Sequence, residues 1–149
     1  MSAVIATSIR VVIPGVPPNW SQSRGHAIAR DVAKARWRDE AWLLAQSARN
    51  AARWPLPVKV DPPAMRYLEV AVYKRSPLFD GDGCVSAIKP LIDGCCGRVL
   101  PTAAPQGVLA WDDSPAWLGL ITAPIDMQHA VATEAEERVV LVVHLVDPR

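Results

Sequence analysis

Three stretches of the chain carry the hydrophobic pattern of β-strands: residues 8–13, 67–73 and 138–146. The alternation is clearest in the second stretch, where Leu68, Val70 and Val72 would share one face and pack into a core. Prolines follow the first stretch directly from Pro14 onward. They indicate an extended loop, because proline fixes φ and lacks a backbone donor.

The segment 27–52 has the composition of a long helix, since it is rich in Ala, Arg and Leu and contains neither Pro nor Gly. Four side chains recur at steps of three and four residues and are expected to face the core: Trp37, Ala41, Leu44 and Ala48. Four basic side chains are expected to point away from it: Arg30, Lys34, Arg38 and Arg49.

The second half of the chain predicts shorter elements. A second helix is expected within residues 83–95, ended by Gly94 or Gly97. Short strands are expected at 108–111 and 117–122, and an irregular polar stretch at 123–137. This order predicts a single α/β (α+β) domain over residues 1–149, a mixed β-sheet with two main helices packed on one side.

Composition narrows the class of protein. A chain of 149 residues with 50% hydrophobic residues can bury the core of one domain. No run approaches the roughly 18 apolar residues of a membrane span, and Arg10 interrupts the N-terminal stretch where a signal peptide would be continuous. Cys84, Cys95 and Cys96 do not form a disulfide framework. We therefore expect buried thiols in a cytoplasmic protein.

Charge is distributed unevenly along the chain. Residues 1–79 contain 12 Lys and Arg against 5 Asp and Glu, a net charge of +7. Residues 80–149 contain 4 against 10, a net charge of −6. A nuclease needs both a surface that attracts phosphate and carboxylates that hold a metal. The same asymmetry also fits a solvated basic helix followed by an acidic tail with no shared purpose.

The chemically richest segment runs from Asp80 to Asp113. It holds five carboxylates and one lysine within 34 residues: Asp80, Asp82, Lys89, Asp93, Asp112 and Asp113. Carboxylates at this density repel one another unless a cation lies among them. Their oxygens suit Mg²⁺ or Mn²⁺, ions that assist phosphodiester hydrolysis. The segment therefore predicts a divalent-metal nuclease.

Helical spacing relates three of these side chains. If residues 82–93 formed one helix, Lys89 and Asp93 would each lie within about 20° of Asp82 around the axis. Pro90 opposes such a helix because it lacks the amide that a helix interior uses. A helix that began near Ser86 or Ala87 would avoid the conflict, with Ser86 as its cap.

Both versions leave the loop carboxylates near Lys89 and place Asp93 one helical turn from it. Asp80, Asp82 and Asp113 would supply the carboxylates for the metal. Lys89 would stabilise the charge that builds on the phosphate, and Asp93 would hold Lys89 in place.

Simpler uses of these motifs remain open. Asp-Gly-Asp-Gly at residues 80–83 also suits a turn, and Asp-Asp-Ser-Pro at 112–115 suits a loop at a strand end. A calcium-binding EF-hand is excluded, because Cys84 and Leu91 stand where that loop needs oxygen ligands.

The order of motifs resembles the RusA family of Holliday junction resolvases. The resemblance lies in Asp-x-Asp at 80–82, Lys-x-x-x-Asp-Gly at 89–94, Asp-Asp-Ser at 112–114 and the opening Ile-Pro-Gly-Val-Pro-Pro-Asn at 13–19, and it covers nearly the whole chain. It implies a homodimeric, Mg²⁺-dependent endonuclease that nicks four-way DNA junctions symmetrically, without an organic cofactor. It implies metal-binding roles for Asp80, Asp82 and Asp113 and a catalytic role for Lys89. Asp93 and Asp112 match further acidic positions of the family.

The chain departs from the family pattern at three points. Gly83 stands where an Asn often follows the second Asp, and Phe79 stands where a basic residue often precedes the first. Lys89 follows Asp82 by seven residues, where the shortest family pattern has four. These departures concern junction preference and rate more than the metal.

A DNA junction presents phosphates on all four arms, so basic side chains should carry most of the affinity. The nearest to the acidic segment are Lys74 and Arg75. The other candidates precede the long helix or lie on it: Arg24, Arg30, Lys34, Arg36 and Arg38. Trp20 either packs in the core or stacks on bases at the crossover. Two alternatives stay open: a nuclease for flaps, forks or duplex, and a junction-binding protein that has lost catalysis.

Overall fold

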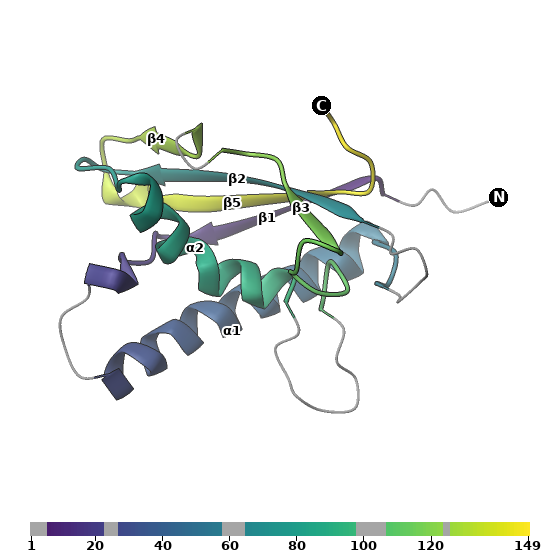
Figure 1. Cartoon of the computed structure of the whole chain (residues 1–149), viewed down its shortest axis with the longest axis horizontal. Coiled ribbons are helices and arrows are strands. Elements are labelled where there is room, and N and C mark those ends of the chain that lie inside the picture. Colours follow the sequence, from purple (N-terminus) through teal and green to yellow (C-terminus); the bar gives the residue numbers. More distant parts are fainter. Residues whose placement is uncertain (1–5, 23–26, 58–64, 98–106, 124–125) are drawn as a thin grey trace.

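The computed structural model describes residues 6–22, 27–57, 65–97, 107–123 and 126–149. Within these ranges the chain forms a five-stranded mixed sheet covered on one side by two main helices (Figure 1). The predicted α+β architecture is confirmed. No helix in the described ranges is both long and apolar enough to cross a membrane.

The centre of the sheet is antiparallel. Strand β5 (Arg138–His144) lies between β1 (Ser8–Pro14) and β2 (Arg66–Lys74) and is antiparallel to both. Two short strands pair in parallel with the other edge of β2, namely β3 (Leu118–Leu120) at its start and β4 (Gln128–Ala130) at its end. All three long strands coincide with the stretches whose pattern predicts them.

Along the chain, each helix follows one long strand of this sheet. Helix α1 (Ala27–Ala52) has the predicted bounds, and helix α2 (Gly81–Cys95) lies between α1 and the sheet for part of its length (Figure 1). Two single-turn 3₁₀ helices, η1 (Trp20–Gln22) and η3 (Glu134–Glu136), precede α1 and β5 respectively.

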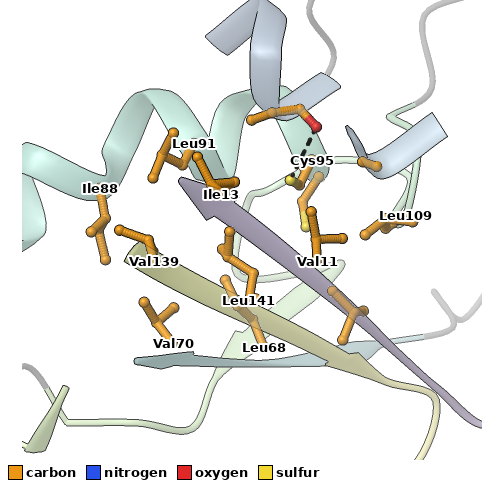
Figure 2. Packing of buried hydrophobic residues seen from close by; sticks show 14 of the residues in the cluster. Val11, Ile13, Leu68, Val70, Ile88, Leu91, Cys95, Leu109, Val139 and Leu141 are labelled. Carbon is orange, nitrogen blue, oxygen red and sulfur yellow. Dashed lines mark hydrogen bonds between the residues drawn. The ribbon is translucent and has the colours of Figure 1, made fainter. Parts of the chain in front are cut away.

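The core fills the space between the sheet and the helices. Side chains of alternate strand positions, among them Val11, Leu68 and Leu141, meet Ile88 and Leu91 of α2, as Figure 2 shows. Helix α1 contributes the buried Ala41 and Ala45 and five partly buried side chains, the predicted Trp37 and Leu44 among them. Burial of this apolar surface is the main stabilising contribution to the fold.

The three cysteines are buried and free, as predicted. Burial raises the pKa of Cys84 and Cys96, and it raises the pKa of Cys95 to about 12. The thiol of Cys95 donates a long hydrogen bond to the carbonyl of Ala41, 3.6 Å away (dashed line in Figure 2). The thiols therefore serve packing, because the reactive thiolate form is disfavoured at neutral pH.

Helix α2 decides between the two starts that the sequence leaves open. It starts at Gly81 and not near Ser86, and Pro90 lies inside it, buried. The side chain of Asp80 caps the earlier start by accepting from the backbone N–H of Gly83, 2.6 Å away. With this start the apolar face of α2 is buried along most of the helix. The free energy gained by that burial outweighs the loss of the hydrogen bond that Pro90 cannot donate.

Two expectations in the second half were wrong. Residues 108–111 form bends instead of a strand, and the stretch expected to be irregular contains β4. The carbonyl of Leu109, which a strand would pair with a neighbour, accepts from the indole of Trp54 at 3.0 Å and from Arg66 at 2.8 Å. Side-chain donors thus satisfy this carbonyl in place of the backbone hydrogen bonds of a sheet.

Candidate active site

The first part of the site is the N-terminus of α2. Asp80 is the N-cap, and Asp82 lies in the first turn, where a negative charge is favoured by the helix dipole. Both side chains belong to exposed residues. The cap engages Oδ1 of Asp80, so this predicted metal ligand also has a structural role.

The structure leaves little room for a side chain at Gly83. A Cβ atom at this position would lie 2.6 Å from Nδ2 of Asn19 and 2.7 Å from Oδ1 of Asp80. Asn19 comes from the proline loop after β1, and its Oδ1 accepts from the backbone N–H of Ser21 at 3.1 Å and from its hydroxyl at 2.6 Å. Glycine at 83 lets this loop lie directly against the start of α2.

The second part of the site is centred on Lys89. Its ammonium donates to Oδ1 of Asp93 at 2.7 Å and to Oδ2 of Asp113 at 2.5 Å. Asp93 is one turn further along α2, as the helical spacing predicts, whereas Asp113 comes from the loop before β3. The backbone N–H of Asp113 in turn donates to the side chain of Asp112 at 2.9 Å. We call Lys89, Asp93 and Asp113 the lysine-aspartate cluster.

All three side chains of the lysine-aspartate cluster have shifted pKa values. Burial lowers the pKa of Lys89, but its hydrogen bonds with Asp113 and Asp93 outweigh that effect and the pKa rises. For Asp113, burial acts to raise the pKa, yet the hydrogen bond from Lys89 prevails and the pKa falls. Burial, followed by the nearby Asp113, raises the pKa of Asp93. Asp113 is therefore the carboxylate that stays ionised most readily beside a protonated lysine.

A buried arginine holds Asp113 in reach of the helix. Arg66, on the core face of β2, donates to the carbonyl of Leu109 and lies against the ring of Trp54, 5.2 Å from its centroid. The N–H of Leu109 donates to the carbonyl of Cys95 at 3.0 Å. These bonds fix the segment before Asp112 against the end of α2. The sequence carried a signal for Arg66, since it continues the alternation of Leu68, which predicts a core-facing charge.

The structure does not bring all the predicted metal ligands together. In the described ranges no group of three or more His, Cys, Asp and Glu side chains is close enough to hold a metal ion. Asp82 and Asp93 are separated by 11 residues of α2, roughly 16 Å along its axis. Asp80 and Asp82 therefore lie at the start of α2, whereas Lys89 lies in its middle and Asp93 near its end.

The basic candidates near the acidic segment have partners in the protein. The ammonium of Lys74 donates to the carbonyl of Pro77 at 2.7 Å and lies 4.9 Å from the ring of Phe79. Arg75 pairs with Glu137 at 3.1 Å. Both side chains nevertheless line a pocket of 780 Å³ that reaches Asp80. They lie beside the start of α2.

The basic candidates on α1 and before it differ in their surroundings. Lys34 and Arg38 line a second pocket together with Lys89 and Asp93. Arg30 is half-buried, and its Nε has no hydrogen-bond partner among the described residues. Arg24 lies outside the described residues. Arg49, expected to point away from the core, donates to the carbonyl of Val108 at 3.4 Å.

Trp20 is buried, so packing is its use in this structure, and the ammonium of Lys34 lies 5.8 Å from its ring. Comparison of the chain with protein-family models, with curated proteins and with solved structures finds no match.

Proposed function

We propose that the protein is a Mg²⁺-dependent endonuclease that cuts branched DNA, four-way junctions above all, by paired phosphodiester hydrolysis in a homodimer. The observation that carries the proposal is the lysine-aspartate cluster, in which Lys89 contacts Asp93 and Asp113 from two separate segments. A protonated lysine beside ionised carboxylates is a common arrangement for stabilising charge on a phosphate. The resemblance to the RusA family and the basic N-terminal half support the choice of DNA as substrate.

The donors available suit magnesium. Since the structure does not bring all three predicted ligands together, either Asp80 and Asp82 at the start of α2 or Asp113 beside Lys89 would hold the ion through carboxylate oxygens, and Mn²⁺ would be accepted as well. Mg²⁺ usually takes one or two protein carboxylates and completes its six ligands with water and phosphate oxygens. The absence of a three-carboxylate group in the described ranges is compatible with this type of magnesium coordination. When bound, the ion would neutralise the phosphate and acidify a water.

The residues of the chain would divide the remaining work. Lys89, whose raised pKa keeps it protonated, would donate to a phosphate oxygen as negative charge develops there. Asp93 would position the ammonium from one helical turn away. Asp112 would orient Asp113 through the backbone N–H that it already accepts.

The decisive test is Asp113→Asn. Synthetic four-way junctions are incubated with enzyme and Mg²⁺, and binding is measured separately without metal. We expect cleavage to fall below detection while junction affinity stays within about twofold, because the variant removes a ligand charge and no basic side chain. Exposed Asp126, which lies beside Glu69 and Arg149, gives the control Asp126→Asn with unchanged cleavage. An active Asp113→Asn enzyme would refute the assignment.

The same assay separates the alternatives. Equal cleavage of a junction, a fork and linear duplex would favour a nuclease of broader specificity. Junction binding without cleavage at any Mg²⁺ or Mn²⁺ concentration would favour a binding protein. The engagement of Asp80 in the helix cap gives that last candidate its specific support.

A further inference from the structure

A pocket of 400 Å³ lies between α1 and α2 and ends at the lysine-aspartate cluster. Lys34 and Arg38 enter it from α1, one turn apart, and Lys89 enters it from α2. The remaining lining residues are Trp20, Asp31, Ala35, Ser86, Pro90 and Asp93. Three cationic side chains thus surround one cavity, and one of them belongs to the candidate active site.

Two residues that line the pocket, Trp20 and Arg38, carry buried hydrogen-bond donors that nothing in the described protein accepts. Trp20 is only 5% exposed, and its indole N–H has no hydrogen-bond partner. The buried Nε of Arg38 lacks one as well, and its nearest carboxylate, Asp39, is 3.7 Å away. Lys34 contacts the ring of Trp20 and has no ion pair among the described residues. Buried donors of this kind normally find an acceptor, so the pocket is suited to a ligand rich in acceptor oxygens.

The charges of the lining select the type of ligand. Three cations stand against two carboxylates, Asp31 and Asp93, and the second of these is already paired with Lys89. The lining side chains therefore carry a formal net charge of +1, and no carboxylate of the lining is paired with Lys34 or Arg38. A phosphodiester carries one negative charge and four oxygens, which matches both the charge and the free donors. A divalent cation would meet Lys34 and Arg38 at close range and be repelled.

We propose that this pocket binds a backbone phosphate of the DNA strand that is to be cut. Lys34 and Arg38 bond its non-bridging oxygens, and the indole of Trp20 donates a further hydrogen bond. Lys89 lines the pocket and belongs to the lysine-aspartate cluster, so this phosphate lies on the same strand as the one that is hydrolysed. The inference rests on the proposed function, and it adds a second, non-reacting contact that holds the strand in register.

The indole N–H of Trp20 provides a direct readout. In ¹⁵N-labelled protein the Trp20 indole signal is assigned with Trp20→Phe and followed during titration with a short single-stranded oligonucleotide and, separately, with inorganic phosphate. We expect the oligonucleotide to move this signal downfield, as a new hydrogen bond forms. Lys34→Gln and Arg38→Gln should each weaken oligonucleotide binding about tenfold and make the salt dependence shallower by about one counterion.

Arg10→Gln is the matched control, because Arg10 is exposed and points from β1 to the face of the sheet opposite the helices. The proposal falls if the Trp20 signal does not respond to the oligonucleotide, or if Arg10→Gln weakens binding as much as Lys34→Gln does. Its failure is separable from that of the proposed function. Junction cleavage without a Trp20 response would remove the pocket alone, whereas a Trp20 response without cleavage would leave a phosphate pocket in a protein that is not a nuclease.

Discussion

Asp80 combines two demands on one side chain. Its Oδ1 caps α2 by accepting from Gly83, and the proposed function asks the same carboxylate to bind a metal. A cap needs only an acceptor oxygen, and asparagine provides one as well as aspartate does. A magnesium ligand needs the negative charge, which asparagine lacks. The two roles can therefore be separated by substitution.

We expect Asp80→Asn to retain the stability of the protein and lose cleavage, whereas Asp80→Ala should lose cleavage and part of the stability. The alanine variant should unfold with a free energy lower by about 1 kcal/mol, since it leaves the first turn of α2 uncapped. Urea unfolding of both variants and cleavage of a four-way junction with Mg²⁺ provide the measurements. If Asp80→Asn cleaved as the native enzyme does, Asp80 would be a cap and no ligand.

At the scale of elements, the site depends on how closely the two helices approach. Gly94 of α2 faces the backbone of α1, and a Cβ atom there would lie 2.3 Å from the carbonyl oxygen of Arg38 and 3.1 Å from the amide of Trp42. Backbone atoms cannot turn aside as the end of a side chain can. The contact at Gly94 therefore sets the distance between Lys89 and the basic side chains across the pocket.

Gly94→Ala should separate the helices and lower the free energy of unfolding by about 3 kcal/mol, because overpacking here meets main chain on the other side. Gly81→Ala is the control within the same helix. Gly81 is exposed in the first turn of α2, where alanine is favoured, so stability should stay equal or rise slightly. Denaturant unfolding of the two variants compares them, and equal stability would show that the helices do not need this approach.

The same contrast between local and distant forces explains what the sequence predicted. The bounds of α1 and the three long strands follow from local composition and periodicity, and so does the meeting of Lys89 with Asp93. The start of α2 does not, because core burial overrides the proline penalty. The approach of Asp113 to Lys89 depends on Arg66 and Trp54, which lie far away in sequence and bind the carbonyl of Leu109. Local spacing along the sequence does not predict a contact between such distant residues.

At the scale of the whole molecule, the core contains three thiols whose charged forms it disfavours. Cys95 keeps its proton up to a pKa of about 12 in the folded protein, whereas the ordinary value is 9.0. Above pH 9 the unfolded chain loses this proton and the folded protein does not. The folded state therefore binds more protons, so stability is complete below pH 9 and declines as the pH rises toward 12.

Cys95 alone should lower the free energy of unfolding by about 1.4 kcal/mol for every pH unit above 9. Urea unfolding at pH 8, 9 and 10 measures this slope, and Cys95→Ala should reduce it by the contribution of one thiol. Lys89→Met is the control, because the raised pKa of Lys89 places its own loss of stabilisation above 10.5, beyond this range. A Cys95→Ala protein with the native slope would mean that the alkaline transition does not begin at Cys95, in the layer between sheet and helices. That layer also supports α2, so cleavage activity should be lost over the same pH range as the fold.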